Sequence, residues 1–255
     1  MADLSREAIP MRFWYQVHRY LGVLIGIQLL FWTLSGLFFS FSPIGKVRGE
    51  HLIRTHEPVN LDDYAWVSVA ELDRLSDASV TLAEIKHRLL LGRPIYELTT
   101  LDSGIKRVDL FDGVTGALLE PIDEEMAKAI ALDDFAEPTE VRRVTRLEQV
   151  GAHSEYRGRE LPAFRVELDH ESGTVIYVSE SRGSVVTRRN TRWRWFDFFW
   201  MLHTMDYQSR DGFNHWPLKI ASLLGVSTVL SGFGLFITRT RWFRRRRRLR
   251  HRTNT

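Results

Sequence analysis

Residues 20–45 read YLGVLIGIQLLFWTLSGLFFSFSPIG and residues 220–238 read IASLLGVSTVLSGFGLFIT, and neither stretch contains a charged residue. A helix rises about 1.5 Å per residue, so roughly 20 apolar residues cross the ~30 Å hydrocarbon layer of a bilayer. We therefore expect transmembrane helices over 11–43 and 216–239. A cleaved signal peptide is the alternative for the first stretch, but the apolar run exceeds the usual ~7–15 residues and no small-residue cleavage site follows. A buried core helix is the alternative for the second.

Basic residues next to these stretches predict the topology. Nine arginines lie between Arg239 and Arg252, and Arg6, Arg12 and Arg19 lie at the other end. Lys and Arg beside a membrane helix favour the cytoplasmic side. We expect 1–10 and the tail 240–255 in the cytoplasm and 44–190 in the periplasm, in a bacterial inner membrane. The tail could instead bind nucleic acid, but its place after a spanning helix favours an anchor at anionic membrane lipid.

Charge and cysteine content narrow the chemistry. Between Ser42 and Lys219 there are 23 Lys and Arg against 30 Asp and Glu, a net charge of −7, which disfavours nucleic acid as a partner. The chain has no cysteine. Disulfides, thiol redox chemistry and thiolate-bound iron–sulfur clusters are therefore excluded, and His, Met, Asp, Glu or Tyr must hold any cofactor.

The central region shows an internal duplication, over about 65–132 and 138–190. Each half has a helical pattern, at 80–90 and 139–150. Each helical pattern precedes two strand-like runs around a tight turn, at 94–101 and 106–112 and then at 162–169 and 174–180. A further helix is expected at 122–131 between the halves, and an aromatic-rich interfacial helix and loop at 191–215. Hairpins with helices on one face predict an α+β fold, not a doubly wound sheet.

Two sets of motifs resemble a known family. GRPIYELTT with VDLFDGVTGALLEPID, and LPAFRVELDHESGTVIYVSESRGSVV, resemble PepSY repeats, in which a hairpin ends at a turn similar to Asp-x-x-Thr-Gly. HRYLGVLIGIQLLFWTLSGLFFSF and WFDFFWMLHTMDY with VLSGFGLF resemble the membrane parts of the PepSY-associated transmembrane family. Many relatives have four membrane helices where this chain has two, so the resemblance implies a homodimer.

The resemblance implies a function in iron supply. It implies a haem-b reductase of the inner membrane that acts on ferric iron or a ferric siderophore in the periplasm. The alternatives are a non-enzymatic, membrane-tethered PepSY binding or regulatory module and an accessory subunit of an uptake system. No G-x-G-x-x-G fingerprint for a flavin or nicotinamide is present, so the electron donor would be a quinol or a cytoplasmic reductase.

Three histidines next to the membrane stretches are the candidate haem ligands. His18 precedes the first stretch, and His203 and His215 precede the second. Neutral imidazoles aimed inward from helices are what haem in a membrane bundle requires. The family pattern favours ligand roles for His18 and His203, against an ordinary interfacial histidine in each case. His215 lies in a loop, where a ligand role competes with an ordinary headgroup-level histidine.

The expected depths of these histidines suggest two sites. His18 is expected near the cytoplasmic face and His203 near the periplasmic face, so one haem cannot bridge them within a protomer. We expect separate inner and outer sites, each completed by a second protomer or another residue. No catalytic residue is assigned.

Overall fold

The computed structural model describes residues 11–72, 81–102, 104–210 and 212–252. The chain divides into two compact units. The helical unit comprises Met1–Phe41 and Asp197–Thr255, and the sheet unit comprises Ser42–Phe196.

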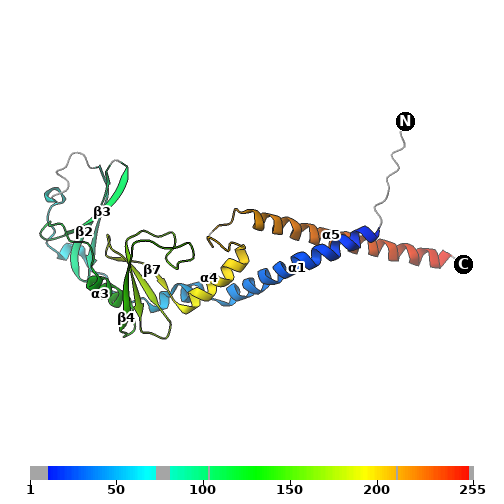
Figure 1. The fold of residues 1–255 in the computed structure, drawn as a ribbon, viewed down its shortest axis with the longest axis horizontal. Helices are drawn as coiled ribbons and strands as arrows, with labels where there is room; N and C mark the ends of the chain where they lie inside the picture. The colour runs from blue at the N-terminus through cyan, green and yellow to red at the C-terminus, as the bar shows by residue number, and fades with distance from the viewer. Residues whose placement is uncertain (1–10, 73–80, 103, 211, 253–255) are drawn as a thin grey trace. The chain divides into compact units, whose positions relative to one another are not determined.

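Two long helices dominate the helical unit (Figure 1), α1 (Met11–Phe41) and α5 (Trp216–Arg252). Within them, His18–Phe41 and Trp216–Ile237 are long and apolar enough to cross a membrane. Their apolar windows are only 11% and 22% buried, whereas a core helix of a soluble protein would be mostly buried. A long apolar helix is thus present at each of the two expected places. The second helix continues through the arginine run.

Local sequence explains where these helices start and stop. Pro43 follows the end of α1, and proline lacks the N–H that would continue the helix. Pro217 lies in the first turn of α5, where its missing N–H has no intrahelical partner to lose.

Small residues line one face of α5. Ala221, Gly225, Thr228 and Ser231 are buried and recur every three or four residues, which places them on a single face. Small side chains let helix backbones approach closely. This face packs against α1, which runs alongside α5 near the N-terminal end of α1 (Figure 1).

The sheet unit contains two antiparallel meanders, each with its strands in chain order. The first consists of β1 (Thr81–Leu90), β2 (Arg93–Asp102) and β3 (Ile105–Asp112). The second consists of β4 (Val141–Leu147), β5 (Ala163–Leu168), β6 (Val175–Ser179) and β7 (Ser184–Arg189). Helix α3 (Glu124–Asp134) lies between them in the chain, and short helical turns α2 (Ile44–Arg48), η1 (Glu50–Leu52), η2 (Leu61–Asp63) and η3 (Val69–Glu71) precede β1.

The two helices expected at the start of each half are wrong. Residues 81–90 form β1, which pairs along its length with β2, and 141–147 form β4, which pairs with β5. Both are edge strands with mostly exposed side chains, so their charged side chains would face solvent in a helix as well as in a strand. The spacing of their apolar residues therefore does not distinguish a helix from a strand. Pairing with a neighbouring strand decides between the two conformations. The predicted fold class, a mixture of helices and antiparallel sheet, is confirmed, because α3 and the strand hairpins form as expected.

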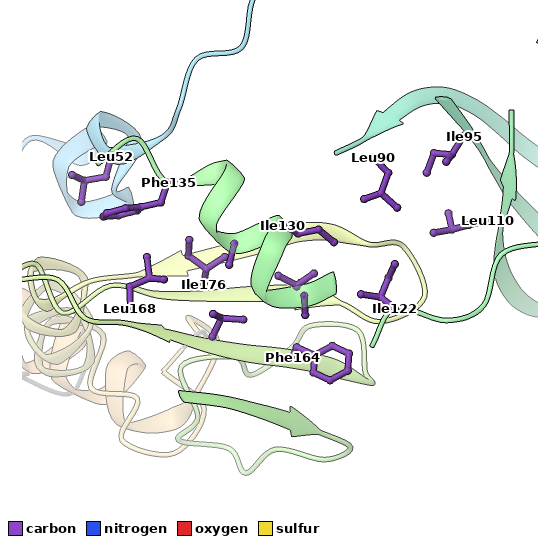
Figure 2. Close-up of a cluster of buried hydrophobic side chains, with 14 residues drawn as sticks. Leu52, Leu90, Ile95, Leu110, Ile122, Ile130, Phe135, Phe164, Leu168 and Ile176 are labelled. Carbon is purple, nitrogen blue, oxygen red and sulfur yellow. The ribbon is translucent and has the colours of Figure 1, made fainter. Parts of the chain in front are cut away.

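Helix α3 organises the core of the sheet unit (Figure 2). Asp123 caps the helix by accepting a hydrogen bond of 2.8 Å from the N–H of Met126. Ile130 and its helix neighbours face the second sheet, where Ile176 is fully buried, while Leu110 of the first sheet belongs to the same cluster. The remaining buried members come from α3, both sheets and the adjoining turns: Leu52, Leu90, Ile95, Ile122, Ala127, Ala131, Phe135, Phe164, Val166, Leu168 and Val178.

An aspartate fixes the turn after β3. Asp112 accepts hydrogen bonds from the N–H groups of Val114 (2.9 Å) and Thr115 (2.7 Å), and Arg93 pairs with it at 2.6 Å. Burial raises the pKa of Asp112, but these hydrogen bonds outweigh it and lower the pKa to about 2. Gly116 adopts φ 73°, which side chains rarely tolerate. This is the Asp-x-x-Thr-Gly turn noted in the sequence.

A buried ion network joins the two sheets. Glu97 of β2 is only 4% exposed and pairs with Arg88 at 3.1 Å and with Arg182. Arg182 lies between β6 and β7 and also contacts Glu160 at 3.2 Å. A buried carboxylate needs such partners, because an unpaired charge in the interior is costly.

Candidate functional site

His18 is held by a serine of the other long helix. Its Nδ1 lies 2.8 Å from Oγ of Ser231 on α5. The Ser231 hydroxyl donates its one hydrogen to the carbonyl of Thr228, at 2.8 Å. Ser231 therefore accepts from Nδ1–H of His18, and Nε2 of His18 keeps its lone pair. Within the described part of the chain, this Nε2 has no hydrogen-bond partner.

His203 is held in the same way by a serine of α1. It lies in helix α4 (Thr191–Thr204), and its Nδ1 is 2.7 Å from Oγ of Ser35, which is fully buried. Ser35 donates to the carbonyl of Phe31 at 2.6 Å, so it accepts from Nδ1–H of His203. Nε2 again keeps its lone pair and has no hydrogen-bond partner among the described residues.

The two serines occupy equivalent motifs, Leu34-Ser35-Gly36 and Leu230-Ser231-Gly232. Each of the two long apolar helices thus supplies one serine that fixes a histidine from another segment. The outcome in both cases is the tautomer with Nε2 available to a metal, since a hydrogen bond at one ring nitrogen sets the role of the other. The repeated motif was visible in the sequence, but its pairing with the histidines was not.

Side chains of α1 also hold the end of α4. The last carbonyls of a helix have no intrahelical partner. Gln28 Nε2 donates to the carbonyl of Leu202 at 3.3 Å, and Trp32 Nε1 donates to the carbonyl of His203 at 2.7 Å. Met205, directly after the helix, adopts φ 57°. Gln28 thus bonds to another helix.

The end of α4 contacts α1 within its apolar segment. Ser35 and Trp32 precede the end of the apolar span at Phe41 by six and nine residues. At about 1.5 Å per residue, His203 lies roughly 9–14 Å along α1 from that end. The aromatic helix α4 therefore ends alongside the apolar segment of α1.

His18 and His203 lie far apart along α1. His18 is on α1, and His203 contacts Ser35, which is 17 residues further along the same helix. This separation corresponds to about 25 Å. The two imidazoles cannot share one metal within a protomer, as the sequence predicted.

An apolar groove of about 500 Å³ lies beside His18. Apart from His18 and Thr228, its lining is apolar: Val229, Gly232, Phe233 and Phe236. A Cβ on Gly232 would lie 3.4 Å from Cε1 of His18, so the glycine gives the imidazole its room. The groove is open on one side.

Aromatic rings surround His203. The ring of Phe39 meets the imidazole edge-on with centroids 5.6 Å apart, and Phe39 also lies 6.0 Å from Trp200. Phe38 stacks on Phe199 at 4.4 Å. These contacts fix the orientation of α4 against α1 around the imidazole.

His215 is arranged differently from the other two histidines. Its Nδ1 accepts a hydrogen bond of 3.3 Å from the N–H of Leu218, so the side chain caps the start of α5. In this tautomer Nε2 carries the hydrogen, and it is buried with no hydrogen-bond partner among the residues that the structure describes. The ligand role expected for His215 stays a prediction, and the geometry favours a capping role.

Asp206 shapes the loop before α5 and was not noticed in the sequence. It accepts hydrogen bonds from the N–H groups of Ser209 (2.9 Å), Gln208 (3.2 Å) and Gly212 (2.9 Å). Burial raises the pKa of Asp206, but these bonds outweigh it and hold the pKa well below its usual range. An aspartate followed by a polar, glycine-containing turn is the available signal.

Within residues 11–72, 81–102, 104–210 and 212–252, no group of three or more His, Asp or Glu side chains is placed to hold a metal ion. No family model, curated protein or solved structure matches the chain.

Proposed function

We propose that this chain is a haem-b protein of the bacterial inner membrane that passes electrons to ferric iron or a ferric siderophore on the periplasmic side. The proposal combines the resemblance to the PepSY-associated transmembrane family with the geometry of two histidines. The observation that supports it most is the matched pair of serine–histidine hydrogen bonds, which leaves Nε2 of His18 and of His203 with a lone pair.

The residues present fit a haem. A haem needs an imidazole with a bare nitrogen and an apolar pocket for its ring. His18 offers both, because its Nε2 is bare and the groove beside it is lined mainly by valine, glycine and phenylalanine. When bound, haem supplies reversible one-electron transfer. His18 and His203 would each hold one group, and Ser231 and Ser35 would keep the two rings in the binding tautomer.

A homodimer would complete these sites. The groove at His18 is open on one side, and each histidine supplies one ligand from its own protomer. Gly22 and Gly26 on α1 have nothing within 4 Å of the position of a Cβ, which leaves room for a close helix contact. A second copy would bring the second wall of the groove and the second pair of membrane helices.

Proteoliposomes test the electron transfer. The purified protein is reconstituted with a reduced quinol analogue inside and a ferric chelate with a ferrous-specific dye outside. The proposal predicts ferrous iron outside, well above protein-free vesicles, and a large loss in His18→Ala and His203→Ala. A rate equal to that of protein-free vesicles would contradict it and would favour a non-enzymatic binding module. His215→Ala is the matched control and should retain the activity.

A further inference from the structure

Arg189, at the end of β7, has its guanidinium held in place without a carboxylate. Its Nε donates to the carbonyl of Glu155 at 3.0 Å, and its Nη1 donates to the carbonyl of Arg188 at 3.2 Å. Its Cζ lies 4.0 Å from the ring centroid of Trp193, in the first turn of α4. These contacts fix the orientation of the cation, and among the described residues no carboxylate forms an ion pair with it. Nη2 has no hydrogen-bond partner among the described residues.

Further arginines lie around this one. Arg157 has its Cζ 5.9 Å from the same Trp193 ring. Burial, with the positive charges of Arg159 and Arg157, lowers the pKa of Arg189 to about 10, although Tyr177 and Glu155 act in the opposite direction. Arg159 is exposed and makes no hydrogen bond or ion pair with any residue that the structure describes. The fold therefore holds like charges together at a cost that an anion would relieve.

The nearby carboxylate is already engaged. Glu155 receives Nε of Arg194 at 2.6 Å and Nη2 of Arg194 at 3.2 Å, one on each oxygen. Such a two-point pair satisfies the carboxylate geometry. Glu155 thus pairs directly with Arg194, and its attraction only partly offsets the positive charge of the cationic face formed by Arg189 and Arg159.

We propose that Arg189 and Arg159, with Trp193, form an oxyanion site that binds the phosphate of an anionic phospholipid headgroup. Guanidinium groups match phosphate geometry. The helix that bears Trp193 indicates that the phosphate belongs to a lipid. Trp195 of α4 is 57% exposed, and Phe199, further along the same helix, packs on Phe38 of the apolar α1 span. Indole rings beside an apolar helix are typical of the headgroup level of a bilayer. The site is independent of any haem.

Photolabelling tests the site in the full chain. The protein is reconstituted in vesicles of phosphatidylcholine with a small fraction of phosphatidylglycerol that bears a photoreactive headgroup, and labelled peptides are mapped by mass spectrometry. We expect label within 155–195 for the native chain. In Arg159→Gln/Arg189→Gln we expect roughly thirty-fold weaker labelling there, since each basic side chain near a membrane surface contributes on the order of 1 kcal/mol. Labelling of the arginine tail at 239–252 serves as an internal reference.

Matched variants make the outcome decisive. Arg143→Gln removes an exposed arginine of β4 and should leave labelling of 155–195 unchanged. Arg159→Gln alone changes an exposed side chain, so it tests the site even if the double variant folds poorly. Label within 155–195 that is equal in native, Arg159→Gln and Arg143→Gln chains would overturn the proposal. Inorganic phosphate that removes the label at constant ionic strength would overturn the lipid assignment, because the site would then take free phosphate.

Discussion

At the residue scale, two serine hydroxyls decide which imidazole nitrogen is available. Ser35 and Ser231 each donate to a backbone carbonyl of their own helix and accept from a histidine. A serine has one hydrogen to give, so the direction of the second bond follows from the first. The histidines and serines form two equivalent pairs about 25 Å apart along α1, by helical rise.

Removing either serine should loosen its histidine. In Ser35→Ala or Ser231→Ala, the ring loses the acceptor at Nδ1 and can rotate or change tautomer. Partners of this kind typically change metal affinity by about 10–100-fold. We expect weaker haem retention and a shifted midpoint potential, measured by haem titration and redox potentiometry. Ser227→Ala is the matched control, since Ser227 is half-buried on α5 and its hydroxyl donates to the Leu223 carbonyl of its own helix. Serine variants that behave like Ser227→Ala would contradict the positioning role.

Asp112 should make the stability of the sheet unit depend on pH. Its pKa is lowered from 3.8 to about 2, so the folded state favours the carboxylate. The stabilisation is present above pH 4 and is lost as pH falls through about 2. Asp112→Asn should unfold at a lower denaturant concentration at neutral pH, because its free energy of unfolding falls by about 2 kcal/mol. Between pH 4 and pH 2 the variant should lose less stability than the native chain. Equal acid sensitivity in both proteins, followed by circular dichroism, would argue against this role.

At the element scale, α1 supports the end of α4 through two side-chain donors. Gln28 and Trp32 satisfy carbonyls that the helix leaves unpaired, and this fixes the backbone at His203. The position of His203 along α1 follows from these two hydrogen bonds.

Trp32→Phe removes the donor to the His203 carbonyl while keeping an aromatic ring. We expect a loss of about 1 kcal/mol in stability and faster hydrogen exchange in the last turn of α4. Trp216→Phe is the control, because Trp216 is 73% exposed. Exchange in the last turn of α4 that is unchanged by Trp32→Phe would show that the capping contact is dispensable.

Elements with an unambiguous pattern could be predicted from the sequence. The two long apolar helices follow from the length of the uncharged stretches, and α3 follows from its acidic first turn and apolar face. β1 and β4 were expected as helices because edge strands with exposed charges lack a clear period, and strand pairing decided them. His18 and His203 were recognised as candidates. Their serine partners depend on the antiparallel register of α1 and α5 and on the position of α4, which no local pattern specifies.

At the scale of the whole molecule, the account requires the sheet unit and the arginine tail on opposite sides of the membrane. The chain has no cysteine, so labelling of a single introduced cysteine shows on which side of the membrane that one position lies. Ser68→Cys, in an exposed part of the sheet unit, should react with a membrane-impermeant maleimide in spheroplasts. Thr253→Cys should react only after permeabilisation. The reverse pattern would invert the predicted topology.

The central claim is that His18 and His203 bind haem, and a reduced-minus-oxidised absorption spectrum of the purified protein tests it most directly. We predict b-type bands that weaken in both His18→Ala and His203→Ala and persist in His215→Ala. No b-type band after haem supplementation, or bands equally strong in both histidine variants, would contradict it.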